Sequence, residues 1–163
     1  MTTNAPEQHV IEAQKLTADA LVDLYEVTLT DGVTYVRFRD GPQVTWQGKT
    51  YESMGARISG IQQSTDGAKM RPTLTVVNPA GIWNAFAHQG LIDGARVTRR
   101  QVLRQYLEED IGLADSAFWY VSRIREIIKN QGATFELRAL TDGPDLKIPA
   151  RVYIPPEFPF VTI

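Results

Sequence analysis

Apolar and polar residues alternate with a period of two along much of this chain, and short turn motifs interrupt the alternation. Tyr25, Val27 and Leu29 are separated by polar residues, and an Asp-Gly pair at 31–32 divides this run from a β-branched and aromatic run at 33–38. A period of two is typical of a strand with one buried face. Asp-Gly between two such runs indicates a hairpin, because both turn positions need positive φ.

The same pattern predicts two further hairpins. The runs 44–46 and 49–51 flank a Gln-Gly pair, and the runs 118–128 and 133–140 flank an Asn-Gln-Gly turn. On the long strand 118–128, four apolar residues are expected to share one face: Phe118, Tyr120, Ile124 and Ile128. Other strands are predicted at 58–61, 73–77 and 96–107. Apart from the strand at 58–61, the segment 53–71 is expected to be a long exposed loop that becomes ordered when the chain assembles with its partners.

Two helices are predicted. A short one near the N-terminus begins after Asn4, and a second begins at Pro79, is capped by Asn78 and ends at Gly90. The apolar residues of the second helix fall on one face at helical spacing, so this helix is expected to pack on a sheet. They are Ile82, Trp83, Phe86 and Ala87.

These elements predict a mainly β fold, an antiparallel β-sandwich or barrel with an N-terminal helix and one packed helix around 79–89. Residues 1–149 are expected to form a single domain. Residues 150–163 are expected to form an extended C-terminal arm, because Pro155, Pro156 and Pro159 exclude a helix or a central strand there.

Composition excludes several function classes. The chain has no cysteine, which removes disulfides, thiolate nucleophiles and iron–sulfur ligation, and its two histidines lack metal-ligand spacing. We therefore expect no metal and no cofactor. A net charge of −2 gives no electrostatic reason to expect nucleic acid or a membrane as partner, and no apolar run reaches the roughly 20 residues that span a bilayer.

Catalytic motifs are not expected either. His9 and His88 are interpreted as surface residues of the two helices, the second favoured by the helix dipole. Glu108, Glu109 and Asp110 could in principle supply the paired acids of a hydrolase. Three adjacent residues in a turn point in different directions, so we predict that the chain is not an enzyme.

One basic cluster leaves an alternative open. If 96–107 is a strand, Arg96, Arg100 and Arg104 share a face, and Tyr106 could stack on bases as in a barrel that binds single-stranded nucleic acid. The other interpretation is that nearby carboxylates neutralise these arginines, either locally or across a subunit contact. The negative net charge favours the second interpretation.

Three segments resemble the minor tail protein L family of long-tailed phages. They are Val44-Thr45-Trp46-Gln47-Gly48 followed by Tyr51, the run from Arg71 to Val76 followed by Asn78, and Val97, Arg99, Arg100 and Val102 downstream. Their order and spacing match over roughly residues 20–152. The resemblance implies a fold related to tail-tube β-barrels. It also implies a structural protein of the virion, made in the host cytoplasm.

The resemblance further implies a place at the tail tip, in the upper baseplate hub between the distal tail ring and the central hub. Partners would be those two proteins and further copies of this chain in a ring, expected to be a trimer, with no membrane and no specific nucleic acid. Residues expected at subunit contacts are Arg71, Tyr153, Ile154, Phe158 and Phe160. Lambda-like members also carry a C-terminal cysteine-rich region associated with an iron–sulfur cluster, which cannot be carried over to a chain without cysteine.

Overall fold

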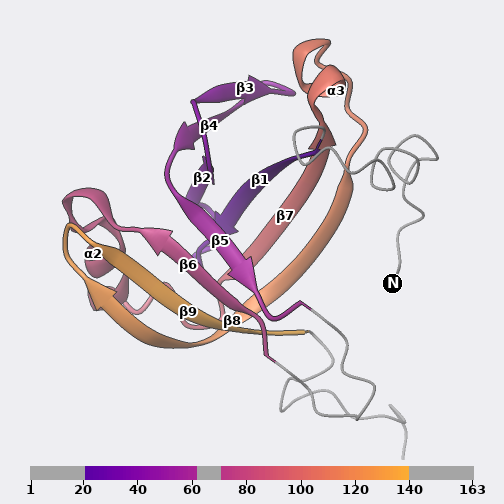
Figure 1. Ribbon diagram of the computed structural model, residues 1–163. Coiled ribbons are helices and arrows are strands. Elements are labelled where there is room, and N and C mark those ends of the chain that lie inside the picture. The colour runs from indigo at the N-terminus through magenta and orange to yellow at the C-terminus, as the bar shows by residue number, and fades with distance from the viewer. Residues whose placement is uncertain (1–20, 62–70, 140–163) are drawn as a thin grey trace, which may run out of the picture.

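The computed structural model describes residues 21–61 and 71–139, which form one nine-stranded sheet with three short helices (Figure 1). The first five strands are β1 (Leu21–Thr28), β2 (Tyr35–Arg39), β3 (Val44–Trp46), β4 (Lys49–Ser53) and β5 (Ala56–Ser59). The remaining strands are β6 (Thr73–Val77), β7 (Arg96–Leu103), β8 (Asp115–Ile128) and β9 (Gly132–Arg138). The helices are the 3-10 turn η1 (Pro79–Gly81), α2 (Ile82–His88) and α3 (Arg104–Glu108).

The strand order is β3-β4-β2-β1-β7-β8-β9-β6-β5, and the sheet curls so that its two ends approach each other (Figure 1). β4 and β5 lie near opposite ends of this order, yet only Met54 and Gly55 separate them in the sequence. The Met54 N–H donates to the Arg39 carbonyl of β2 at 3.0 Å, and the Gly55 carbonyl accepts from the Val77 N–H of β6 at 2.9 Å. This two-residue link therefore closes the sheet into a barrel-like shape.

The predicted mainly β class is confirmed, and the curled sheet corresponds to the barrel alternative. The prediction of purely antiparallel pairing is wrong at one position, because β4 runs parallel to β2. The reason is the hairpin of β3 and β4, in which Gln47 and Gly48 both have positive φ, as their turn requires. This hairpin returns the chain so that β4 runs in the same direction as β2.

The main core fills the interior of the curl. Trp83 of α2 lies at its centre, with ring centroids 6.0 Å from Phe38, 5.4 Å from Phe135 and 6.2 Å from Phe86, all edge to face. Edge-to-face aromatic pairs add specific attraction to their burial. The predicted packing of this helix on the sheet is thus confirmed, through Trp83, Phe86 and Ala87.

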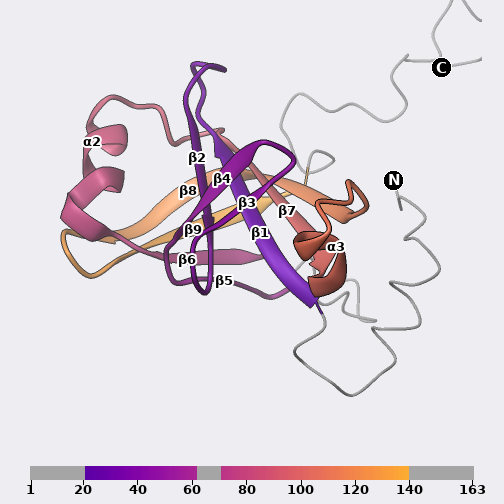
Figure 2. The ribbon, with the colours of Figure 1, turned by 90° about the horizontal axis from the view of Figure 1, so that it is seen from above.

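A second core covers the other face of β1. Tyr25, Val27 and Leu29 point into the main core, whereas Val22 and Leu24 point into the second one, as alternation along a strand requires. Figure 2 shows β3 and β4 lying across β1, and their side chains complete the second core together with those of β7 and α3. The residues contributed by these elements are Trp46, Tyr51, Val102, Leu103 and Tyr106.

The face predicted for β8 is wrong at both ends of the strand. Trp119, Val121, Ile124 and Ile127 face or pack against the core, whereas Phe118 and Ile128 are exposed. The pairing of β8 with β9 shifts between Val121 and Arg123 and again between Ile124 and Glu126. Each β-bulge adds one residue and so exchanges the inward and outward faces. A prediction based on a strict period of two therefore assigns the wrong face to the residues beyond a bulge.

Three other predicted boundaries need correction. The helix expected from Pro79 is divided, because Ala80 and Gly81 have φ of 55° and 75°, and the regular helix begins at Ile82. The strand expected over 96–107 ends at Leu103, where α3 begins. The short strand expected at 58–61, within the loop predicted over 53–71, is present as β5 at Ala56–Ser59 and pairs with β6 along its length. The predicted N-terminal helix and the arm 150–163 lie outside the described residues.

Candidate assembly surfaces

A buried carboxylate on β1 gathers cations from three other strands. Glu26 is 6% exposed, and its oxygens lie 2.6 Å from Arg37 Nε of β2, 3.1 Å from Arg100 Nη2 of β7 and 3.4 Å from Lys49 Nζ of β4. Burial alone would raise the pKa of Glu26, but the hydrogen bonds from Arg37 and Arg100 outweigh burial and hold that pKa below its ordinary value. The carboxylate is therefore ionised and joins four strands.

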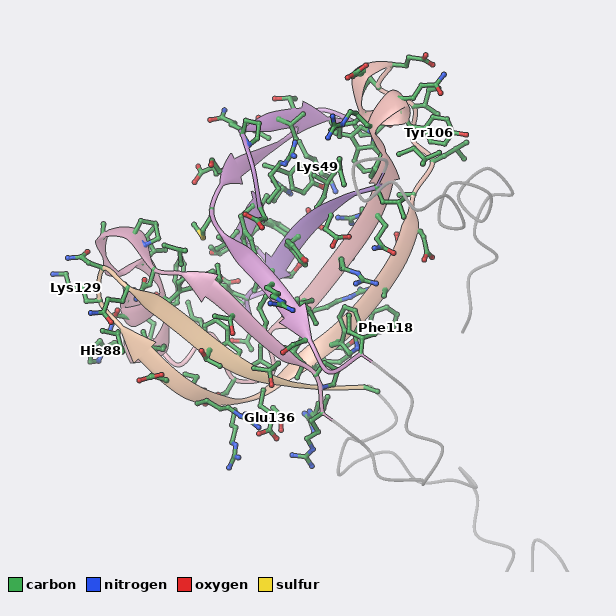
Figure 3. All side chains as sticks on the ribbon, in the orientation of Figure 1. Lys49, His88, Tyr106, Phe118, Lys129 and Glu136 are labelled. Atoms are coloured by element: carbon green, nitrogen blue, oxygen red, sulfur yellow. The ribbon has the colours of Figure 1, made fainter. Side chains whose placement is uncertain are left out.

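A second carboxylate, on β9, is arranged in the same way. Glu136 is 4% exposed and lies 2.9 Å from Arg71 Nη1, 3.0 Å from Arg123 Nε and 3.2 Å from Arg125 Nη2 (Figure 3). The hydrogen bond from Arg71 contributes most to lowering the pKa of Glu136, to about 2. The bulge between Val121 and Arg123 places Arg123, rather than Ser122, opposite Glu136, and Arg125 follows two residues later on β8.

An aromatic face lies on the outside of β7 and β8. Phe118 is 42% exposed, its ring is perpendicular to that of Tyr120 at a centroid distance of 6.2 Å, and the Arg96 guanidinium lies 4.5 Å from the Phe118 ring centroid. Arg96 and Tyr120 are cross-strand partners, which holds the three side chains together. Arginine and aromatic residues are enriched at the energetic centres of protein interfaces.

Of the three arginines that were predicted to share a strand face, Arg96 and Arg100 share one on β7, whose pairing with β1 and β8 is regular, whereas Arg104 does not. Arg96 packs on Phe118, Arg100 binds Glu26, and Arg104 belongs to α3 because β7 ends at Leu103. The predicted shared face is therefore confirmed for Arg96 and Arg100 and wrong for Arg104. The alternative interpretation, neutralisation by carboxylates, holds for Arg100, although its partner is Glu26 rather than an acid near in sequence.

The acidic run at 108–110 does not form a catalytic pair. Glu108, Glu109 and Asp110 are exposed at the end of α3. Asp110 Oδ1 accepts from the Gln47 N–H at 2.6 Å, and the neighbouring Ile111 carbonyl accepts from Trp46 Nε1 at 3.0 Å. These contacts fasten the β3–β4 hairpin, so the paired-acid alternative is wrong.

Among the predicted contact residues, the structure places Arg71 beside Glu136 with its side chain 50% exposed. Tyr153, Ile154, Phe158 and Phe160 lie outside the described residues. Sequence reasoning missed the two buried carboxylates, because Glu26 and Glu136 occupy the polar positions of alternating strands. Their burial depends on cations from elements distant in the sequence, and we see no local signal that could have revealed it.

Within residues 21–61 and 71–139, no three metal-ligating side chains come close enough together to hold an ion. Over the same ranges, no helix has the length and apolar character needed to cross a membrane. His88 is exposed in the last turn of α2, where it was predicted.

Comparison with known proteins identifies the family. The family model described as phage minor tail protein L matches residues 33–157. The chain belongs to this family. Its members are structural phage tail proteins rather than enzymes, and this membership confirms the expected location in the virion tail. The family resemblance noted in the sequence is likewise confirmed.

Two individual proteins extend the comparison. Tail tip protein L of Escherichia phage lambda is 34% identical over 105 residues, which are 60% of this chain and 45% of the lambda protein. A solved chain from the virion of a native gene transfer agent particle superimposes with a TM-score of 0.65 at 21% identity, and the match covers 92% of this chain and 50% of that one. Because the sequence identity to this second protein is only 21%, the similarity shows a shared fold and nothing about function. The chain spans half or less of the length of both proteins.

Proposed function

We propose that this chain is a structural subunit of the tail tip of a long-tailed phage, where it forms part of the upper baseplate hub. It would link the distal tail ring to the central hub as a ring of three copies. The observation that carries this proposal is the match to the phage minor tail protein L family over residues 33–157, on a sheet curled like a barrel.

The charge clusters support a structural role. Glu26 and Glu136 each join strands through three cations, and each carboxylate is almost fully withdrawn from water. Removing one member of a buried, hydrogen-bonded charge cluster is strongly destabilising, so such clusters oppose local changes of strand register. A ring subunit needs this resistance because its neighbours recognise a fixed surface.

Subunit contacts would come from two kinds of surface. The aromatic face of Arg96, Phe118 and Tyr120 offers exposed side chains on rigid strands. Arg71 and the arm 150–163, with Tyr153, Ile154, Phe158 and Phe160, would reach neighbouring chains. A net charge of −2 suits a lumen past which DNA slides without sticking.

Cryo-electron microscopy of the purified tail tests the proposal. Residues 21–61 and 71–139 should fit density between the distal ring and the central hub, in three copies. Absence of the chain from purified tails, or density for it elsewhere in the virion, would refute the proposed position.

A pair of surface variants tests the aromatic face. Phe118→Asp should reduce entry of the chain into tails, whereas Val33→Asp should enter normally, since Val33 is an exposed apolar residue in the β1–β2 turn and does not contact Arg96, Phe118 or Tyr120 through a ring interaction. Both variants should keep the parent melting temperature. Equal entry of the two variants would exclude the aromatic face as a contact.

A further inference from the structure

A polar pocket of about 580 Å³ opens between β5 and the strands β1, β2 and β7. β5 is the last strand of the sheet and pairs only with β6 among the described residues, so its other backbone edge is unpaired there. The charged side chains that line the pocket come from all four strands and from α3. They are Asp23, Arg39, Asp40, Arg57, Arg99 and Arg104.

Three of these arginines have no carboxylate partner among the described residues. In the described part of the chain, Arg39, Arg57 and Arg99 form no ion pair, whereas Arg37 and Arg100 bind Glu26. The nearest specific contact of Arg99 is the Trp119 ring, whose centroid lies 5.8 Å from the guanidinium. The pocket thus holds arginines without ion pairs, and two carboxylates, Asp23 and Asp40, line it as well.

Unsatisfied polar atoms gather at the same place. The buried side-chain atoms without a hydrogen-bond partner in the described residues are Asp23 Oδ1, Arg39 Nε and Arg99 Nε, and all three residues line the pocket. A buried polar atom left without a partner is unfavourable, because it has lost its hydrogen bonds to water. Their grouping around one pocket indicates a ligand that supplies acceptors to two guanidinium groups and a donor to one carboxylate.

We propose that this pocket binds a carboxylate side chain on an extended acidic segment of a neighbouring tail protein. Arginine and carboxylate form charge-assisted hydrogen bonds, which are roughly twice as strong as neutral ones. The peptide N–H groups of the segment provide the donor that Asp23 requires. The backbone of the segment can also pair with β5, because an extended peptide can add as a further strand to an unpaired sheet edge.

The same observations disfavour a nucleic-acid strand as the occupant. A phosphodiester offers acceptors to the arginines but carries no donor for Asp23 Oδ1.

The test uses the purified full-length chain and two synthetic peptides, acetyl-Val-Glu-Val-Glu-Val-amide and its neutral match acetyl-Val-Gln-Val-Gln-Val-amide. We expect the acidic peptide to shift the side-chain Nε–H resonances of Arg39 and Arg99 saturably. The neutral peptide should bind about tenfold more weakly or worse, since it lacks the charge-assisted bonds. The Nε–H signals of Arg37 and Arg123, already bound to Glu26 and Glu136, should not move.

Arg39→Gln should abolish the response, and Arg96→Gln should keep it, because Arg96 lies on β7 outside the pocket. Equal responses to both peptides, or no response to either, would overturn the proposal. So would an equally strong response to inorganic phosphate, which would indicate a general anion site.

The choice of partner rests on the proposed function and is tested in tails. A photo-crosslinking residue at Asp40, exposed on the pocket wall, should capture a peptide of another tail protein that contains Asp or Glu. Capture of DNA, or of this chain alone, would overturn that assignment. The peptide titration does not depend on tail assembly. An incorrect pocket assignment would therefore be seen in the titration, and an incorrect position at the tail tip would be seen only in the experiments on tails.

Discussion

The side chain of Asn78 accepts a hydrogen bond from the backbone N–H of Trp83 at 3.1 Å, five residues further along the chain. Asn78 Nδ2 donates to Asn84 Oδ1 at 2.7 Å and to the Ile128 carbonyl of β8 at 3.1 Å, and the residue is fully buried. Asn78 therefore provides a hydrogen-bond acceptor for a backbone N–H in the first turn of α2 and connects that helix to β8. Trp83, the centre of the main core, is positioned by this bond.

Asn78→Ala is expected to destabilise the chain by about 2–4 kcal/mol, because it leaves the buried Trp83 N–H without a partner and removes the hydrogen bonds from Asn78 to Asn84 and to the Ile128 carbonyl. Urea denaturation followed by tryptophan fluorescence measures the change. Asn84→Ala is the matched control and should cost less than half as much, since Asn78 keeps its other two hydrogen bonds. Equal losses for the two variants would show that the position of Trp83 does not depend on Asn78.

Glu136 should make the stability depend on acid pH. Its pKa is about 2 in the folded chain and 4.5 in an unperturbed carboxyl, so the unfolded state binds the proton more tightly. The stabilisation is complete above about pH 4.5 and is lost as the pH falls toward 2. Glu136→Gln should flatten the stability profile within this window, measured by urea unfolding at successive pH values. Glu126→Gln, an exposed carboxylate on β8, should leave the profile unchanged.

Much of the fold could be predicted because its signals are local. The Gln47-Gly48 turn, the alternation along β1 and the apolar face around Trp83 each depend on residues close together in the sequence. The bulges of β8 could not be predicted in this way. The first of them places Arg123 opposite Glu136 on the next strand, and a cross-strand register is not visible in the sequence of β8 alone.

The two charge clusters and the pocket were hidden for a similar reason. Glu26 occupies a polar position in an alternating strand, which normally faces water. It is buried because the β3–β4 hairpin lies across β1 and delivers Lys49. Arg100 was assigned to a basic face since its neighbours in sequence are arginines, whereas its actual partner is 74 residues away. Contacts at this range are set by topology rather than by local pattern.

The chain is expected not to bind single-stranded nucleic acid appreciably at physiological salt. Arg100 is held by Glu26, and β7 ends before Arg104, so the continuous arginine face that such binding would use is not formed. A gel-shift titration with a single-stranded oligonucleotide at several salt concentrations is the measurement. Retarded bands at physiological salt that weaken as salt rises would contradict this expectation.

The last prediction concerns the arm 150–163, which lies outside the described residues. Its apolar side chains are Val152, Tyr153, Ile154, Phe158, Phe160, Val161 and Ile163. Burying four of them would contribute roughly 6–12 kcal/mol before ordering costs, so exposure to water in the assembled tail is unfavourable. Pro155, Pro156 and Pro159 restrict the backbone and reduce the entropy lost when the arm docks. We propose that the arm docks on a neighbouring chain of the ring or hub.

Deletion of residues 155–163 separates this proposal from an arm that folds back on its own domain. If the arm lies between subunits, the truncated chain should melt almost like the parent, because the barrel and both buried charge clusters are complete without it. It should nevertheless fail to enter tails, as measured by mass spectrometry of purified virions. A full-length variant with Phe158→Ala and Phe160→Ala should show a milder form of the same defect. A large drop in the melting temperature of the isolated truncated chain would mean that the arm belongs to its own core.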